Sequence, residues 1–403
     1  MVRKSGDEDW RGELECWLAP FLSCLHHTHQ RHWAPVYLRG LLGPGERKSV
    51  TRLAERVAPG EQDQLHNFVA VAPWELAAPG RALVEKANAL VGGAHAHLIV
   101  DETSWPKQGR HSVGVARQWC GMLGKTANCQ VAVSLTLSRG EVPVPIALRL
   151  YLPADWAADL ERRRQAGVPD EVPFAPKWKL ALDEIGRVLA AGVRFGDVLA
   201  DAGYGEVIAF RQRLDELGLP WAVGISAAQQ VYPVAVQVHT PQPGGRGHPR
   251  WHPWPDRPAV STEAMIAGRG KRAWRRLSWR TGTKGELTCR FAAVRARVAD
   301  GAPCAAGGRL PGRQGWLIGE WRDDGEKKYY LSNLPRQASR MRLARMIRAR
   351  WVCEQGHQQM KEELGLDHYE GRSWQGLHHH LFLTMVAMAF LQHLRLAGRK
   401  RGR

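Results

Sequence analysis

Apolar residues recur at helical spacing near the start of the chain. Six of them stand at offsets of 0, 3, 4, 7, 8 and 11, which places them on one helix face: Leu14, Trp17, Leu18, Phe21, Leu22 and Leu25. A Gly-Pro-Gly sequence at 43–45 interrupts the pattern, and residues 49–57 then have the spacing of another short helix. Residues 1–93 are therefore expected to form a helical N-terminal domain.

From residue 94 the pattern becomes that of strands. Residues 98–100 are an apolar run that stops at Asp101, which is typical of a buried strand. Further segments rich in Val and small residues predict sequential strands with tight turns: 112–116, 130–137 and 142–152. A helix at 178–191, a strand at 197–200 that stops at Asp201, a helix at 207–217 and a strand at 221–225 complete an α/β sheet over residues 94–225.

The next segment, 226–338, is expected to be a β-rich insertion. Pro and Gly cluster at 241–258 and predict a loop, and three strands are predicted at 290–298, 315–321 and 329–333. Residues 339–366 return to a helical pattern, and 381–394 predict a last apolar helix. We therefore assign 339–394 to a second part of the α/β core, followed by a basic tail at 395–403.

The composition of the chain limits the classes of protein to which it can belong. The chain of 403 residues has 57 Lys and Arg against 39 Asp and Glu, a net charge of +18 that favours a polyanionic partner, although coding bias can also enrich arginine. The longest clean apolar stretch, 381–391, is too short to span a bilayer. Acidic residues before the first apolar run argue against a secretory signal. Seven cysteines without a Cys-x-x-Cys pair indicate reduced thiols, as in a cytoplasmic protein.

Two aspartates are the first candidates for chemistry. Asp101 and Asp201 each follow a predicted strand, and carboxylates at strand ends of one sheet can converge on divalent ions. Mg²⁺ prefers such oxygen ligands, and two ions can clamp the attacking and leaving oxygens of a phosphoryl transfer. An aspartate after a strand is also a common turn or cap residue. Asp201 stands in Asp-Ala-Gly-Tyr-Gly, whose glycines allow the backbone to bend and approach a ligand.

A third carboxylate is expected from the helix around residue 350. Arg350 is followed at offsets of 4, 7 and 11 by Glu354, His357 and Lys361, which places the four side chains on one face. Glu354 would complete the metal site, and the two cations would hold phosphates. A solvated charged face explains the same spacing. Glu362 and Glu363 are rival acids.

These residues together resemble the DDE transposases of bacterial insertion sequences. The sequence is similar to the IS-four superfamily, whose signature is Tyr-x2-Arg-x3-Glu-x6-Lys. Arg350, Glu354 and Lys361 match its last three positions, while Ile347 stands at the tyrosine position, so the DNA-end role of that tyrosine is absent here or belongs to Trp351. The resemblance extends over residues 94–391 and includes segments 101–107, 114–121, 128–130, 201–205 and 365–372.

The resemblance implies a fold and a reaction. The fold is an RNase H-like mixed α/β sheet, with the β-rich insertion between the second acid, Asp201, and the third acid, Glu354. Asp101, Asp201 and Glu354 are implied to hold two Mg²⁺ ions, with Mn²⁺ as a substitute. The reaction is cut-and-paste transposition of double-stranded DNA: binding terminal inverted repeats, freeing 3′-OH ends and joining them to target DNA. A homodimer on DNA, a DNA-binding role for residues 1–93, and a bacterial, nucleoid-associated location follow. Two alternatives remain: a domesticated DNA-binding protein that does not cut, and an RNase H-like structure-specific nuclease.

Basic clusters supply candidate DNA contacts. In the insertion, arginines alternate with tryptophan, which suits phosphate contact and base stacking; the candidates are Arg272, Trp274, Arg275 and Arg276. A solvated loop with packed tryptophans explains them equally well. Lys107 and Lys125 flank the first aspartate strand and are either phosphate contacts or solvated lysines. The histidines at 26–32 and 378–380 lack partners at zinc spacing, so we expect them on the surface or facing DNA.

Overall fold

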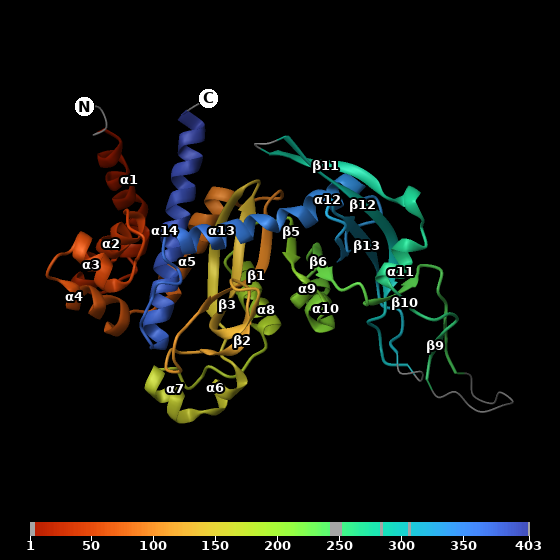
Figure 1. The fold of residues 1–403 in the computed structure, drawn as a ribbon, viewed down its shortest axis with the longest axis horizontal. Helices are drawn as coiled ribbons and strands as arrows, with labels where there is room; N and C mark the ends of the chain where they lie inside the picture. Colours follow the sequence, from red (N-terminus) through yellow and green to blue (C-terminus); the bar gives the residue numbers. More distant parts are fainter. Residues whose placement is uncertain (1–4, 242–251, 283–284, 305–307, 402–403) are drawn as a thin grey trace. The chain divides into compact units, whose positions relative to one another are not determined.

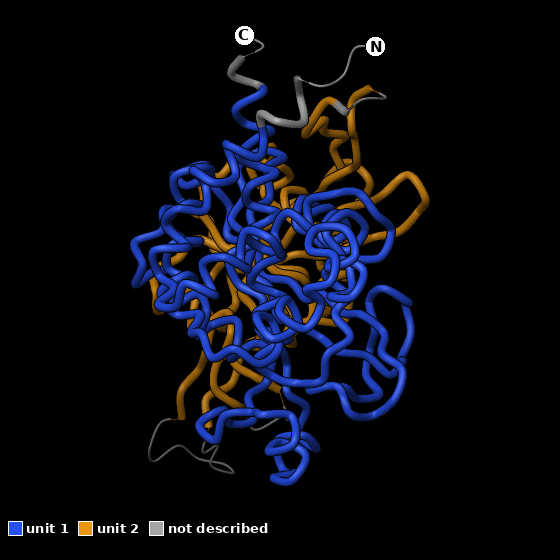
Figure 2. Tube along the Cα trace, turned by 90° about the vertical axis from the view of Figure 1, so that its left-hand side faces the viewer, with its two compact units in different colours: residues 1–196, 351–403 blue, residues 197–350 orange. Residues whose placement is uncertain are grey.

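The computed structural model describes residues 5–241, 252–282, 285–304 and 308–401. The chain divides into two compact units, residues 1–196 with 351–403, and residues 197–350 (Figure 2). Both units contain helices and strands, which confirms a mixed α/β protein. The first unit contains Asp101 and Glu354, and the second contains Asp201.

The first unit begins with helices, as the apolar spacing predicts (Figure 1). They are α1 (Ser5–Leu22), α2 (Thr28–Leu42), α3 (Val50–Val57), α4 (Gln62–His66), the π-helix η1 (Asn67–Val71) and α5 (Ala77–Val91). Five of the six spaced apolar residues are buried: Leu14, Trp17, Leu18, Phe21 and Leu25. The helices α2, α5 and η1 pack against α14 (Trp374–Arg401), so they share a core with the rest of this unit.

The first unit's sheet is antiparallel and centred on β3. Its strands are β1 (His97–Pro106), β2 (Ala116–Cys120), β3 (Lys125–Arg139) and β4 (Val142–Leu150), and β3 pairs with each of the others. The expected end of the first strand at Asp101 is wrong, since β1 continues to Pro106 in register with β3. The strand expected at 112–116 begins only at Ala116. Three helices follow, α6 (Ala154–Ala158), α7 (Leu160–Ala166) and α8 (Lys177–Ala190).

The apolar helix α14 is longer than expected. It is helical as far as Arg401, through most of the segment assigned to a basic tail, and residues 402–403 lie outside the described residues. Of the helices that the structure describes, α14 is the one long and apolar enough to cross a membrane, over Trp374–Gly398. Its most apolar stretch is 61% buried within the protein, as in a core helix, and it packs on β4.

The second unit is a mixed sheet. Parallel strands β5 (Asp197–Ala200) and β6 (Trp221–Ile225) match their predicted bounds, with α9 (Ala202–Gly205) and α10 (Ile208–Glu216) between them. The sheet continues in the order β6, β14 (Lys327–Ser332), β13 (Gln314–Trp321), β12 (Gly285–Val298), β7 (Gln230–Pro233) and β10 (Val260–Ser261), and β11 (Arg275–Gly282) also pairs with β12. The strands predicted between Asp201 and Glu354 are thus confirmed.

Smaller elements complete the second unit: the pair β8 (Val238–His239) and β9 (Trp254–Pro255), the helix α11 (Thr262–Ala267), the 3-10 turn η2 (Lys271–Ala273) and α12 (Arg340–Ala349). Most of the predicted loop at 241–258 lies outside the described residues. The helix expected at 339–366 is two helices, because α12 ends at Ala349 and α13 (Trp351–Glu362) begins in the first unit. Arg350 is the C-cap residue of α12, while Glu354, His357 and Lys361 lie on α13.

Candidate active site

Asp101 lies in the middle of β1, where strand pairing fixes its backbone opposite Ser134 of β3. Its side chain is buried, and its Oδ1 accepts a hydrogen bond of 2.9 Å from the amide of Glu102. The hydroxyl of Ser134 donates to the Asp101 carbonyl at 3.2 Å. A buried carboxylate held at both main-chain and side-chain atoms is a rigid ligand for a cation.

A buried cluster joins Asp101 to helix α13. The ligand atoms of Asp101, Cys353 and His357 all lie within 4.8 Å of one another. The Cys353 sulfur is 3.6 Å from Nε2 of His357 and 3.3 Å from the Thr136 hydroxyl of β3. The sequence pattern predicts His357 only on a charged face and gives no role to Cys353. The available signal was Cys-x3-His, one helical turn apart, on the helix that carries Glu354.

Glu354 lies in the first turn of α13, directly after Cys353, and its side chain is exposed. The rival acids Glu362 and Glu363 are exposed too, and they accept hydrogen bonds from Gln358 and Gln359 at 2.9 Å. Helix α13 packs against β1 and β3. The first unit therefore packs the helix that carries Glu354 against the strand that carries Asp101.

Two lysines of the predicted set have internal partners. Lys361 donates a hydrogen bond of 2.8 Å to the Ser104 carbonyl of β1. Lys107 donates to the Tyr369 carbonyl. Burial lowers the pKa of both lysines, and the Asp367 carboxylate opposes that shift in each. Both side chains thus help to hold α13 and the segment after it to the first unit's sheet.

Asp201 caps helix α9 in the second unit. Its Oδ1 accepts from the amide of Tyr204 at 3.3 Å. Gly205 after it serves packing, because a Cβ on this residue would lie 1.9 Å from the Gly224 carbonyl of β6. Only glycine allows α9 to lie this close to β6. The convergence of Asp201 with Asp101 and Glu354 stays a prediction.

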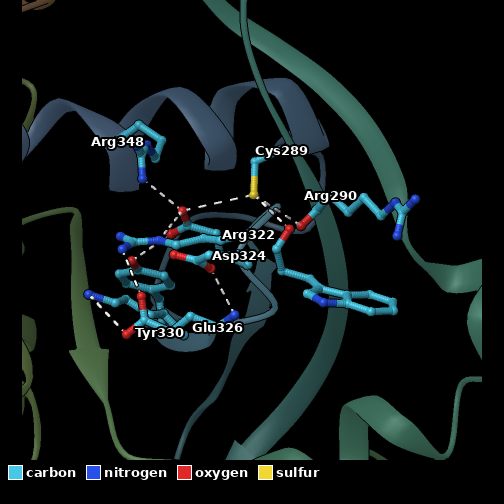
Figure 3. Close-up of polar contacts among 10 residues, drawn as sticks. Cys289, Arg290, Arg322, Asp324, Glu326, Tyr330 and Arg348 are labelled. Carbon is cyan, nitrogen blue, oxygen red and sulfur yellow. Dashed lines mark hydrogen bonds and ion pairs between the residues drawn. The ribbon is translucent and has the colours of Figure 1, made fainter.

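A buried ion cluster holds helix α12 in the second unit (Figure 3). The Glu320 carboxylate of β13 is fully buried, accepts from Arg348 of α12 at 2.7 Å and from the Tyr330 hydroxyl at 2.8 Å, and pairs with Arg322 at 3.2 Å. Burial, with the Glu320 charge second, raises the pKa of Tyr330 and brings that of the neighbouring Cys289 to about 11. Arg350 lies two residues after Arg348, at the end of this anchored helix.

The signature tyrosine position is part of the core. Ile347, which occupies it, is buried in α12, so its side chain is not available to DNA. Trp351, the alternative aromatic residue, opens α13 and is 39% exposed. Of these two, Trp351 is the one whose ring a nucleic acid can reach.

The remaining predicted cations differ in exposure. Lys125 at the start of β3, Arg272 of η2 and Arg275 of β11 are exposed. Arg276 is exposed but bonds Thr288 at 3.0 Å and Asp323 at 3.5 Å. Trp274 packs edge-on against Trp321 with ring centroids 5.6 Å apart, which is the packed-tryptophan alternative.

The histidines at the end of the chain differ from our expectation. His379 and His380 of α14 are buried, so their predicted surface or DNA-facing position is wrong. Both His379 nitrogens face backbone carbonyls, and His380 bonds Tyr37 at 2.8 Å. The run of three histidines belongs to a helix whose residues 379–390 are all buried. The histidines at 26, 27, 29 and 32 are exposed.

Comparison with known proteins identifies similar sequences. The family model described as DDE superfamily endonuclease matches residues 20–286. The chain is 32% identical over 193 residues to the probable transposase for insertion sequence element IS701 of Microchaete diplosiphon, and the match covers 48% of each chain. The chain thus spans about half the length of this relative. The cryo-EM structure of the piggyBac transposase synaptic complex with hairpin DNA aligns with 98% of this chain and 74% of its own, at 10% identity and a TM-score of 0.46.

Proposed function

Because this chain belongs to the DDE superfamily endonucleases, we propose that it is a cut-and-paste transposase of a bacterial insertion sequence. It binds the terminal inverted repeats of its element, hydrolyses phosphodiester bonds to free 3′-OH ends, and joins those ends to target DNA. The similarity to the probable IS701 transposase supports this assignment.

The proposed catalytic residues are Asp101, Asp201 and Glu354, which would hold two Mg²⁺ ions or Mn²⁺ in their place. Three carboxylates fit these ions by donor chemistry, since Mg²⁺ prefers hard oxygen ligands and retains water and phosphate oxygens. When bound, the ions supply activation of the attacking oxygen and stabilisation of the leaving oxygen. Glu354 is exposed and can meet a hydrated ion and DNA, while strand pairing holds Asp101 in place.

The packing of α13 against β1 supports the assignment of Asp101 and Glu354 within the family. Helix α13 lies against β1 and is tied to it through the Lys361–Ser104 hydrogen bond of 2.8 Å. The strand with the first acid and the helix with the third acid therefore belong to one packed unit, although 253 positions separate Asp101 from Glu354 in the sequence.

The exposed cations supply the proposed DNA affinity. We assign phosphate contacts first to Lys125, Arg272 and Arg275, whose side chains are exposed. Arg350 and Arg276 are further candidates, and Trp274 can stack on bases only through an accessible face of its ring. Lys361 and Lys107 donate to backbone carbonyls within the first unit, so we assign them first to holding α13 and the segment after it, and a phosphate contact by either would require that bond to break. Phosphate contacts of this kind fix register and orientation rather than reading sequence.

The proposal includes an assembly and a place in the cell. The catalytic core has the RNase H-like fold of DDE enzymes, the β-rich segment is an insertion between the second and third acids, and the helical domain at 1–93 binds DNA. Joining two element ends requires two active sites, which favours a homodimer on double-stranded DNA. The net charge of +18 suits a cytoplasmic protein that stays at the nucleoid.

The test uses the full chain with DNA that carries the inverted repeats flanking its gene. We expect nicking and strand joining with Mg²⁺ or Mn²⁺, and complex formation with little chemistry in Ca²⁺, which accepts looser geometry. Chelation by EDTA should abolish both reactions. Binding without cleavage in every metal would favour the domesticated DNA-binding protein, and cleavage without joining would favour a structure-specific nuclease.

A further inference from the structure

The cluster beside the first acid has its own metal chemistry. We propose that Asp101, Cys353 and His357 form a binding site for one divalent cation of the zinc class. The site uses the Asp101 carboxylate, the Cys353 thiolate and the His357 imidazole, and leaves a fourth position for water. It is distinct in its ligands from the three-carboxylate site, with which it shares only Asp101.

The geometry of Cys353 and His357 suits such an ion. A tetrahedral zinc site with Zn–S of about 2.3 Å and Zn–N of about 2.0 Å separates sulfur from nitrogen by about 3.5 Å. The observed separation of Sγ from Nε2 is 3.6 Å. Their spacing of four residues on α13 brings both side chains to one face of the helix. With all three ligand atoms within 4.8 Å, a small rotation of side chains closes the set.

The donor set selects the class of metal. Thiolate and imidazole are ligands for zinc and similar transition metals, whereas Mg²⁺ and Ca²⁺ prefer oxygen alone. Asp101, Cys353 and His357 are 8%, 0% and 6% exposed, so the three ligands are shielded from bulk solvent. Binding would replace the thiol proton of Cys353 by the metal, and that proton would pass to solvent. The hydroxyl of Thr136, 3.3 Å from the sulfur, can then donate to the thiolate.

The shared carboxylate gives the site a regulatory consequence, which rests on the proposed function. An Asp101 bound to zinc is no longer an open ligand for Mg²⁺. Zinc should therefore inhibit DNA cleavage, and added Mg²⁺ should restore it only partly, because transition metals bind nitrogen and sulfur ligands more tightly.

Cobalt(II) tests the site without any activity assay. The full chain is stripped with EDTA, dialysed and titrated with Co²⁺, which absorbs strongly when bound to a thiolate. We expect a thiolate-to-cobalt band that saturates at one ion per chain and is displaced by Zn²⁺. Cys353→Ser should remove the band, and His357→Gln should weaken binding by at least about tenfold. Cys120→Ser, which alters another buried thiol of the same unit, is the control. A band that survives in folded Cys353→Ser protein would overturn the proposal.

A measurement on the unaltered chain guards against variants that fail to fold. X-ray absorption at the zinc edge should show one sulfur at about 2.3 Å among nitrogen and oxygen ligands. A shell of oxygen and nitrogen alone would overturn the site.

Inhibition is measured as each protein's cleavage rate with zinc relative to its own rate without it, and we expect Cys353→Ser to be at least about tenfold less sensitive to zinc. Zinc that binds without inhibiting cleavage would contradict the proposed competition between zinc and Mg²⁺ for Asp101. Absence of Mg²⁺-dependent cleavage would refute the proposed function, while the cobalt titration would still test the site.

Discussion

The ammonium group of Lys361 donates a hydrogen bond of 2.8 Å to the backbone carbonyl of Ser104, three residues after Asp101 in β1. The bond ties the last turn of α13 to the strand of the first acid. Lys361→Ala should lower the free energy of unfolding by about 1–3 kcal/mol, since a charged donor is lost from a partly buried carbonyl. Chemical denaturation measures this change.

The exposed Lys125 is the matched control for Lys361. Lys125→Ala should leave stability unchanged but reduce the salt dependence of DNA binding by about one counterion. For Lys361→Ala we expect an unchanged salt slope and slower cleavage at saturating protein, because the Glu354 helix is less firmly held. A lower salt slope with unchanged stability would show that Lys361 contacts phosphate instead.

Glu320 should be far more sensitive to substitution than an exposed acid of the same unit. Glu320→Gln leaves Arg348 and Arg322 without their buried partner, and breaking such a pair costs about 3–5 kcal/mol. Glu326→Gln breaks an exposed pair with Arg322 and should cost less than about 1 kcal/mol. Urea unfolding of the two variants provides the comparison, and equal losses would mean that Glu320 does not anchor α12.

His380 should make stability depend on pH. Burial lowers its pKa from 6.5 to about 4, and its ring bonds Tyr37 and the Gly365 carbonyl. Between these values the unfolded state binds more protons than the folded state, so stability is full above about pH 6.5 and falls as the pH decreases, by up to about 1.4 kcal/mol per pH unit.

Urea unfolding from about pH 7.5 to about pH 4.5 measures that slope. His380→Gln should reduce the slope by the part that His380 contributes. Burial also lowers the pKa of His378 and His379 to about 4, so part of the slope should remain in His380→Gln. An unchanged slope in His380→Gln would contradict the contribution of His380.

Gly205 should tolerate no side chain. A Cβ there would lie 1.9 Å from the Gly224 carbonyl and 2.9 Å from Val223, so Gly205→Ala should cost about 1–3 kcal/mol or more and displace α9 with Asp201. Gly186→Ala in α8 has open space and should stabilise by about 0.5–1 kcal/mol. Thermal unfolding should show a lower Tm for Gly205→Ala and a higher Tm for Gly186→Ala. Changes of Tm in the same direction would contradict the packing role of Gly205.

The sequence predicts elements well where the signal is local. The bounds of β5 and β6 follow from continuous apolar runs. The extension of β1 past Asp101 depends on pairing with β3, and alternating polar residues conceal it. The boundary at Arg350 has no proline or glycine to mark it, so one long helix was expected. The contact of Cys353 with Asp101 and Thr136 is non-local, and only the folded unit reveals it.

The most direct test of the account is cleavage and joining of element-end DNA by Asp101→Ala, Asp201→Ala and Glu354→Ala, with Glu362→Ala as an exposed acid of the same helix. We predict that each of the first three loses both reactions yet binds DNA as well as the unaltered chain, because removing a carboxylate reduces repulsion of phosphate. Glu362→Ala should retain both reactions. Cleavage retained by Glu354→Ala and lost in Glu362→Ala would contradict the third acid, and cleavage retained by Asp101→Ala or Asp201→Ala would contradict the carboxylate site itself.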